Sequence, residues 1–242
     1  MNIIINGAGG RMGKALRAML EKKGVTAAAL VDPFVQEAGV LSQLTDYTGS
    51  ADCIIDFSNH AGTQALLDYA LQNKMPVVVC TTGHTPQELE VIAKAAEQIP
   101  VFRSGNMSLG IAVLTQLVKE AAKMFPDADI EILESHHNQK LDVPSGTALM
   151  LAHSVQAVRQ EATLLVGRHE NGKRTAQEVG IHSIRMGNTV GIHEVIINTG
   201  TQILTLKHEA QDRSLFAEGA LSAAEFLVGQ APGLYCMDDI VK

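Results

Sequence analysis

Residues 134–147 read Glu-Ser-His-His-Asn-Gln-Lys-Leu-Asp-Val-Pro-Ser-Gly-Thr, which places two imidazoles and an ammonium within five positions. Ser145 stands where the N-cap of a helix belongs, directly before an apolar stretch over 148–158. The N–H groups of Gly146 and Thr147 would then point outward from a helix N-terminus, which carries partial positive charge and binds anions. Together these groups predict a pocket for a small substrate with carboxylates.

The same run also has an interpretation without chemistry. Adjacent histidines at a strand end are often one packed and one exposed ring, and a Pro-Ser-Gly turn before a helix is ordinary capping. Strict strand alternation would point His136 and His137 to opposite faces. Either the strand ends there, or only one of the two rings faces the pocket.

A second group of residues has the order of a dinucleotide-binding unit. The segment Gly7-Ala-Gly-Gly-Arg-Met-Gly13 lies between an apolar run at 3–5 and a helical pattern that ends near Gly24. The next apolar run, 27–31, closes with Asp32. A glycine-rich turn alone is a weak signal, because plain strand–helix loops use one too. The flanking strands and the acid in register favour cofactor binding.

Each part of this unit has a physical role. Gly7 permits the tight turn, Gly9 and Gly10 let the backbone approach a pyrophosphate, and Gly13 allows close packing of helix on strand. The carboxylate of Asp32 lies where it would accept hydrogen bonds from an adenosine ribose. The glycine spacing is best read as Gly-x-x-Gly-x-x-Gly, which is not the commonest form.

Alternating elements continue through the first half of the chain. Strands are expected at 53–57, 76–80 and 101–102, and helices at 60–72 and 86–98. This alternation predicts a Rossmann-type, doubly wound parallel sheet, in which ligands bind beyond the carboxyl ends of the strands. The loops at 7–13, 32, 81–82 and 104–107 would all lie at that edge.

The pattern changes after residue 108. We expect a helix at 110–125, a strand at 129–135, a helix from 148 to about 160, three strands at 182–186, 191–198 and 203–208, and a helix at 214–228. This order predicts an α+β domain with a largely antiparallel, mixed sheet. The expected organisation is α/β overall: a dinucleotide-binding domain at 1–107, completed by 214–242, and a substrate-binding and oligomerisation domain at 108–213.

Composition and charge exclude several classes of protein. A net charge of −7 without a basic cluster disfavours nucleic acid as a partner. No apolar stretch approaches the length of a membrane span or of a signal peptide. The three cysteines have neither disulfide-framework nor zinc-site spacing. We therefore expect a cytoplasmic protein without a metal site.

The motifs, taken in order, carry a specific resemblance. Along with the two segments above, the chain contains Thr81-Thr82-Gly83, Gly105-Asn106-Met107-Ser108, Arg185-Met-Gly-Asn-Thr-Val-Gly-Ile-His193 and Pro232-Gly-Leu-Tyr235. Nearly the whole chain resembles the dihydrodipicolinate reductase family of bacterial lysine and diaminopimelate synthesis. The resemblance implies an NAD(P)H-dependent reduction of a cyclic dicarboxylate imine, with loss of water, by a homotetramer assembled through the C-terminal sheets.

The resemblance also implies roles for individual residues. His136 matches the family's acid/base and Lys140 its proton-donating lysine. His137 matches a substrate contact, and Gly146 with Thr147 the pair that binds a substrate carboxylate. The positions that match cofactor contacts are Gly7, Ala8, Gly9, Gly10, Arg11, Met12, Asp32, Cys80, Thr81, Thr82, Ser104, Gly105, Asn106 and Met107.

The chain departs from the family pattern at a few positions. Met107 replaces a usual Phe, and Cys80 stands where Gly is common. Pro33 follows Asp32, where some members carry an arginine for the 2′-phosphate of NADP. A carboxylate without that arginine repels the phosphate, although Arg11 is able to compensate. We expect NADH as the preferred cofactor, with NADPH left open.

Two other functions remain open on the residues alone. One is another NAD(P)-dependent dehydrogenase that acts on a small amino or keto acid, which would not need both histidines and the Gly146-Thr147 turn. The other is a dinucleotide sensor without catalysis, which should carry a DNA-binding helix pair and a basic face.

Overall fold

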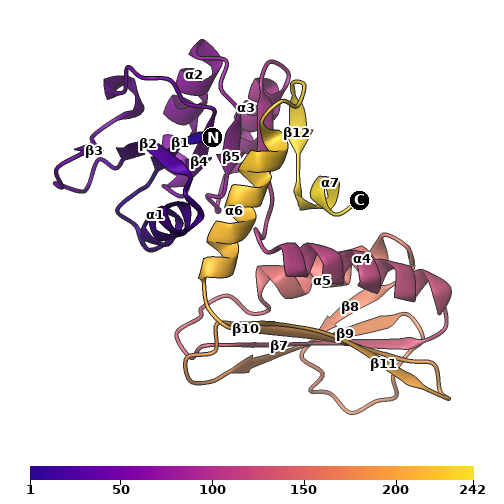
Figure 1. Cartoon of the computed structure of the whole chain (residues 1–242). Coiled ribbons are helices and arrows are strands. Elements are labelled where there is room, and N and C mark those ends of the chain that lie inside the picture. Colours follow the sequence, from indigo (N-terminus) through magenta and orange to yellow (C-terminus); the bar gives the residue numbers. More distant parts are fainter. The chain divides into compact units, whose positions relative to one another are not determined.

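The computed structural model describes residues 1–242 and divides into two units. Residues 1–108 and 213–242 form the first unit, and residues 109–212 form the second (Figure 1). The first unit is thus built from both ends of the chain.

A seven-stranded parallel sheet forms the centre of the first unit, in the order β12-β6-β5-β4-β1-β2-β3. The strands are β1 Asn2–Asn6, β2 Thr26–Val31, β3 Val40–Leu41, β4 Cys53–Asp56, β5 Val77–Val79, β6 Pro100–Arg103 and β12 Gly233–Tyr235. The helices are α1 Arg11–Lys23, α2 Thr63–Gln72, α3 Pro86–Ala96, α6 Ser214–Leu227 and α7 Met237–Ile240, with short 3-10 turns at Leu44–Asp46 and His60–Gly62.

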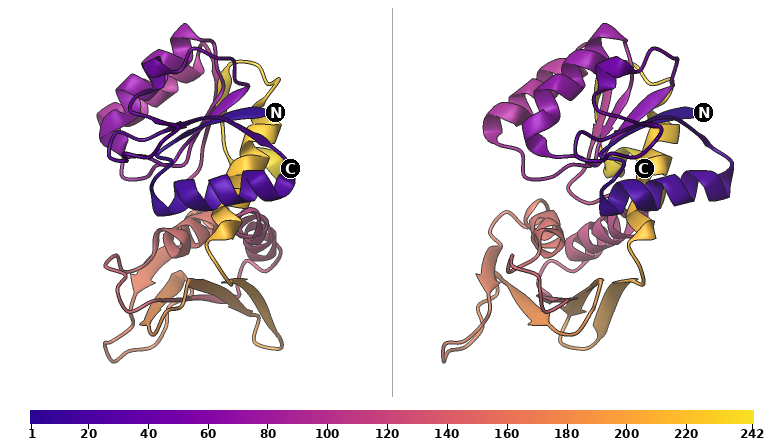
Figure 2. Two further views of the ribbon diagram at one scale, coloured as in Figure 1. Left: turned by 60° about the vertical axis from the view of Figure 1, so that its left-hand side comes forward. Right: turned by 90° about the vertical axis from the view of Figure 1, so that its left-hand side faces the viewer.

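The central strands of this sheet are apolar because helices cover both of their faces. The side chains of Ile3, Ile4 and Ile5 are fully buried, and so are those of all three residues of β5. Helices α2 and α3 pack on one face of the sheet, and α1 and α6 on the other (Figures 1 and 2). The doubly wound parallel sheet predicted from the sequence is confirmed.

The second unit is a five-stranded sheet, in the order β11-β10-β7-β9-β8, with two helices on one face (Figure 1). The strands are β7 Asp129–His136, β8 Thr163–Val166, β9 Glu178–Arg185, β10 Gly191–Asn198 and β11 Ile203–Ala210. The helices are α4 Leu109–Met124 and α5 Gly146–Gln156. Leu114 of α4 and Leu151 of α5 share a buried cluster with Ile130 and Ile132 of β7.

This sheet is mixed, as expected, but only half of its pairings are antiparallel. Strand β10 runs antiparallel to β7 and β11, whereas β9 runs parallel to β7 and β8. Strand β8 was not predicted, because four residues with little burial on either side give no clear alternation. Strands β8 and β9 therefore both run in the same direction as β7.

Candidate active site

The glycine-rich loop connects β1 to α1, and two of its glycines are required by the packing. Gly7 has φ +81°, and a Cβ there would lie 2.6 Å from the backbone carbonyl of Phe57. A Cβ on Gly13 would lie 2.1 Å from the carbonyl oxygen of Gly7. The loop therefore adopts this close turn only with glycine at both positions.

The N-terminus of α1 is suited to an anion. Gly10 is the N-cap, no side chain caps the helix, and its first turn contains no acidic residue. Ala8 is buried and donates its N–H to Val31, while Arg11 is exposed and Met12 half-buried at the start of the helix. The N-terminal N–H groups and the dipole of this helix fit a pyrophosphate.

Asp32 connects the end of β2 to the glycine-rich loop. Its Oδ2 accepts a hydrogen bond from the Gly9 N–H at 3.0 Å, and its Oδ1 accepts one from the Phe34 N–H at 3.0 Å. The carboxylate is buried. It is thus held rigidly beside the loop, in the position expected of a ribose-binding acid.

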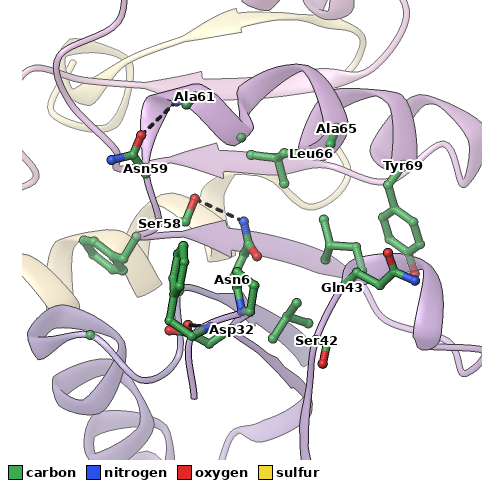
Figure 3. A pocket seen from close by; sticks show the side chains of 18 of the residues that line it. Asn6, Asp32, Ser42, Gln43, Ser58, Asn59, Ala61, Ala65, Leu66 and Tyr69 are labelled. Carbon is green, nitrogen blue, oxygen red and sulfur yellow. Dashed lines mark hydrogen bonds between the residues drawn. The ribbon is translucent and has the colours of Figure 1, made fainter. Parts of the chain in front are cut away.

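A cavity of about 650 Å³ opens beside these residues. Figure 3 shows Asn6 and Asp32 on one side of it, Leu66 and Tyr69 of α2 on another, and Gln43 next to Tyr69. Its volume falls in the range of small-molecule and cofactor sites. No lysine or arginine belongs to the lining, which consists of Asn6, Gly7, Gly10, Val31, Asp32, Pro33, Phe34, Ser42, Gln43, Leu44, Thr45, Phe57, Ser58, Asn59, Ala61, Gly62, Ala65, Leu66 and Tyr69.

The loop after β5 is anchored to the end of β4 by hydrogen bonds. The hydroxyl of Thr81 donates to Oδ2 of the buried Asp56 at 2.6 Å, while Thr82 is exposed. Burial raises the pKa of Cys80 well above its usual value, so its thiol stays protonated, and its N–H donates to the Asp56 carbonyl. Sequence reasoning gave Asp56 no role.

The loop of Ser104, Gly105, Asn106 and Met107 is held at the end that leads into α4. Asn106 Oδ1 accepts the N–H of Ser108 at 2.8 Å. Met107 is buried, and a Cβ on Gly219 of α6 would lie 1.6 Å from its carbonyl oxygen. Helix α6 therefore fixes the end of this loop by direct backbone approach.

In the second unit, the first histidine of the run is a buried member of β7. The strand ends at His136, and His137 is half-buried in the loop that follows. Nδ1 of His136 lies 2.6 Å from Oε2 of Glu134. Burial lowers the pKa of His136, and Glu134 opposes the shift without cancelling it.

Glu134 is a buried and fully paired carboxylate. Arg185 reaches it with two parallel hydrogen bonds, Nη1 to Oε2 and Nη2 to Oε1, each 2.8 Å long. The N–H of Ser145 donates to Oε1 at 3.1 Å. Burial raises the pKa of Glu134, but hydrogen bonds from Arg185, His136 and Ser145 outweigh burial and lower it to about 2. The group is therefore ionised at neutral pH.

His193 of β10 completes this cluster, and sequence reasoning gave it no role. Its ring packs edge-on against His136, with ring centres 5.1 Å apart. Its Nε2 lies 3.1 Å from the hydroxyl of Ser145. Burial, and then the neighbouring His136, lower the pKa of His193 to about 4. This imidazole is therefore neutral and serves packing and hydrogen bonding.

The remaining predicted residues of this unit lie around the start of α5. Ser145 is its N-cap and accepts the N–H of Ala148 at 3.2 Å. Gly146 is exposed with open space beside its Cα, and Thr147 is half-buried in the first turn. Lys140 is partly buried, and its Nζ lies 2.9 Å from Oδ1 of the exposed Asp142. An ammonium and a helix N-terminus are thus both present beside the histidines.

The predicted site residues fall into two groups, one in each unit. The glycine-rich loop, Asp32 and the loops after β5 and β6 belong to the first, and the histidines, Lys140 and the α5 N-terminus belong to the second. No group of three or more His, Cys, Asp or Glu side chains is arranged to hold a metal ion. No helix combines the length and the apolar character needed to cross a bilayer.

Comparison with known proteins covers both units. Residues 1–107 match the family described as dihydrodipicolinate reductase, N-terminus, and residues 110–241 match its C-terminus counterpart. A 4-hydroxy-tetrahydrodipicolinate reductase of Caldanaerobacter subterraneus is 44% identical over 100% of this chain and 98% of its own. One from Brachyspira hyodysenteriae is 37% identical over 100% of both chains.

The fold has a counterpart among solved structures. A dipicolinate-bound dihydrodipicolinate reductase from Paenisporosarcina sp. TG-14 superposes with a TM-score of 0.83 at 24% identity, over 99% of each chain. Matches over both halves and identity up to 44% along the whole chain establish the relationship: this chain belongs to the dihydrodipicolinate reductase family.

Proposed function

We propose that this chain reduces 4-hydroxy-tetrahydrodipicolinate, a cyclic dicarboxylate imine, to tetrahydrodipicolinate with NADH or NADPH. The observation that carries the proposal is the full-length relationship to reductases of that name. In the reaction, the substrate's hydroxyl leaves ring carbon C4 as water, and a hydride takes its place. One proton is consumed overall.

We assign cofactor binding to the first unit. The uncapped α1 N-terminus, the turn at Gly7 and the carboxylate of Asp32 fit a dinucleotide, and the 650 Å³ cavity beside them has room for its adenosine half. When bound there, NAD(P)H supplies the hydride. The loops anchored by Asp56 and Gly219 supply backbone groups to the nicotinamide end.

We assign substrate binding to the second unit. The ammonium of Lys140 and the N–H groups of Gly146 and Thr147 bind the two carboxylates, which fixes the orientation of the ring. Such placement of a bound reactant contributes much of an enzyme's rate acceleration.

His136 moves the proton. Its lowered pKa leaves the imidazole neutral at neutral pH, and Glu134 occupies Nδ1, so Nε2 is the nitrogen able to accept a proton. Nε2 takes a proton from the ring carbon between C4 and the imine carbon, and a proton from solvent converts the leaving hydroxyl to water. Once C4 has received the hydride, the His136 imidazolium returns its proton to that same ring carbon.

NADH is the preferred cofactor in this proposal. The cavity lining contains the carboxylate of Asp32 but no lysine or arginine to pair with a 2′-phosphate. A negative phosphate beside a buried carboxylate is repelled.

The chain assembles as a homotetramer through the second sheet in this proposal, in the cytoplasm. The support is the sheet face opposite α4 and α5, which carries apolar side chains without covering helices: Leu133, Ile184, Ile192, Ile196 and Ile203. The three cysteines are unpaired, in line with a reducing compartment. Light scattering after size-exclusion chromatography should give the mass of four chains, and a monomer mass would contradict the assembly.

The activity is tested by a coupled assay. A synthase that condenses pyruvate with aspartate semialdehyde makes the substrate in the cuvette, and NADH absorbance is followed after this chain is added. NADH should be oxidised only when both precursors are present. Absence of oxidation by the wild-type chain, with either nicotinamide cofactor, would contradict the proposed function.

A further inference from the structure

Glu134 contacts two elements that the proposed function uses for different tasks. Its Oε2 accepts hydrogen bonds from Nδ1 of His136, which is the proposed proton carrier, and from Nη1 of Arg185. Its Oε1 accepts hydrogen bonds from the backbone N–H of Ser145 and from Nη2 of Arg185. Ser145 is the N-cap of α5, the helix proposed to bind a substrate carboxylate. A single carboxylate thus lies between the proton carrier and the carboxylate-binding turn.

The strand register makes this arrangement rigid. Glu134 and His136 are two residues apart on β7, so both point to the same face of the sheet. The parallel partner strand β9 places Arg185 opposite His136, and the antiparallel partner β10 places His193 opposite Glu134. Glu134 is 1% exposed, so water does not compete for its oxygens.

An ion pair of this kind is not needed for stability alone. Burying a carboxylate is unfavourable in principle, and apolar residues often fill such a site at least as well. The partners of Glu134 show a different use, because each of its oxygens holds one functional element while Arg185 fixes the carboxylate plane.

We propose that Glu134 is the positioning residue of the substrate site: it keeps the proton of His136 on Nδ1 and fixes the N-cap of α5 at the same time. Nε2 is then always the nitrogen that exchanges a proton with substrate. The inference rests on the proposed function for its kinetic consequences, but the protonation pattern of His136 is measurable without any turnover.

The key variant is Glu134→Gln. Its amide N–H group can donate to Nδ1 of His136, which would move the ring proton to Nε2 and block that nitrogen as a base. We expect kcat to fall by about a hundredfold or more, and KM for the substrate to rise, because the α5 N-cap loses a charged anchor. Glu134→Asp, which keeps the charge, should recover part of kcat.

The same strand offers a matched control. Glu131 also lies on β7, paired with Arg174 and His182, but it points to the opposite face of the sheet. Glu131→Gln removes an equivalent charge. Because Glu131 lies on the face proposed for assembly, kcat is compared in protein that keeps the wild-type mass by light scattering, and there it should stay within about twofold. Equal losses in Glu131→Gln and Glu134→Gln would reduce Glu134 to a general structural role and overturn the proposal.

The second readout is the ¹⁵N NMR spectrum of the histidines, assigned with a His136→Gln variant. In the wild type above pH 7, His136 should show a protonated Nδ1 and an unprotonated Nε2, and Glu134→Gln should reverse the pattern. A wild-type ring protonated on Nε2 overturns the proposal even if the variant does not fold. If the wild type lacks reductase activity but shows the Nδ1 pattern, the proposed function fails while the positioning role stands.

Discussion

The hydroxyl of Thr81 lies 2.6 Å from the carboxylate of Asp56, across the gap between the loop after β5 and the end of β4. The same carboxylate accepts hydrogen bonds from the side chains of Asn6 and Ser58. Asp56 therefore connects the ends of three neighbouring strands, at the edge of the parallel sheet where we propose that the cofactor binds.

Replacing Asp56 should weaken both stability and cofactor binding. Asp56→Ala removes the acceptor of the buried Thr81 hydroxyl, whereas Asn6 and Ser58 are partly or fully exposed. We therefore expect a loss of about 1–3 kcal/mol of unfolding free energy and a KM for NADH raised about tenfold. Urea denaturation and steady-state kinetics measure the two effects. Thr81→Ser keeps the hydroxyl and should change neither, and an Asp56→Ala variant with unaltered KM would show that the loop needs no anchor.

His136 and Lys140 of the second unit should both be needed for turnover. His136→Ala and Lys140→Ala should each lower kcat by about a hundredfold or more, since one loses the proton carrier and the other a carboxylate partner. NADH binding, followed by fluorescence, should be the same as in wild type, because the residues proposed to bind the cofactor lie in the other unit. An unchanged kcat would remove that residue from the mechanism.

The rate should depend on pH through His136. The neutral imidazole is the active base and its pKa lies below the ordinary 6.5, so kcat/KM should be constant near neutrality and fall only as the pH drops below that value. Profiles of kcat/KM between pH 4.5 and 8 measure this decrease. A decrease with its midpoint above pH 7 would show that another group carries the proton.

Stability should also decline in acid, through His193. Its pKa of about 4 lies below the unfolded value near 6.5, so between these pH values the unfolded chain binds a proton that the folded chain refuses. The contribution of His193 to the free energy of unfolding is fully present above pH 6.5. It decreases by up to about 3 kcal/mol as the pH falls to 4. Urea midpoints across this window measure the slope, which His193→Gln should flatten.

Cofactor preference should respond to charge at the cavity. The wild type should have a kcat/KM for NADH at least about tenfold above that for NADPH, and Pro33→Arg should reduce the ratio by giving the 2′-phosphate a partner. Pro33 lines the cavity, whereas the exposed Ala38 does not, so Ala38→Arg is a control for added charge alone. A ratio that changes equally in both variants would mean that long-range charge, rather than contact, sets the preference.

The sequence predicted most of the first unit because local patterns determine it. Buried runs such as 3–5, helix signals and the glycine-rich turn each specify an element without reference to distant residues. Strand β12 was missed because three residues after a proline look like a tail, and it becomes a strand only by pairing with β6. The family assignment also decides against the two alternatives, another dehydrogenase or a non-catalytic sensor.

The polar network of the second unit was less predictable. Glu134 and His136 are two apart on one strand, so their contact follows from alternation alone. Arg185 is fifty-one positions from Glu134 and reaches it only because β9 runs parallel to β7. A largely antiparallel sheet gives no such pairing, and a histidine in a strand pattern, such as His193, does not reveal what it faces.

The return of the chain to its first unit has a consequence for synthesis on the ribosome. Residues 109–212 emerge as one continuous segment. The first sheet, in contrast, lacks β12 and the buried apolar face of α6, which includes Ala220, Leu221 and Ala224, until residues 213–242 are made. Until those residues are made, residues 1–108 expose part of their apolar surface, to which chaperones can bind. Residues 109–212 are made later but are able to fold earlier.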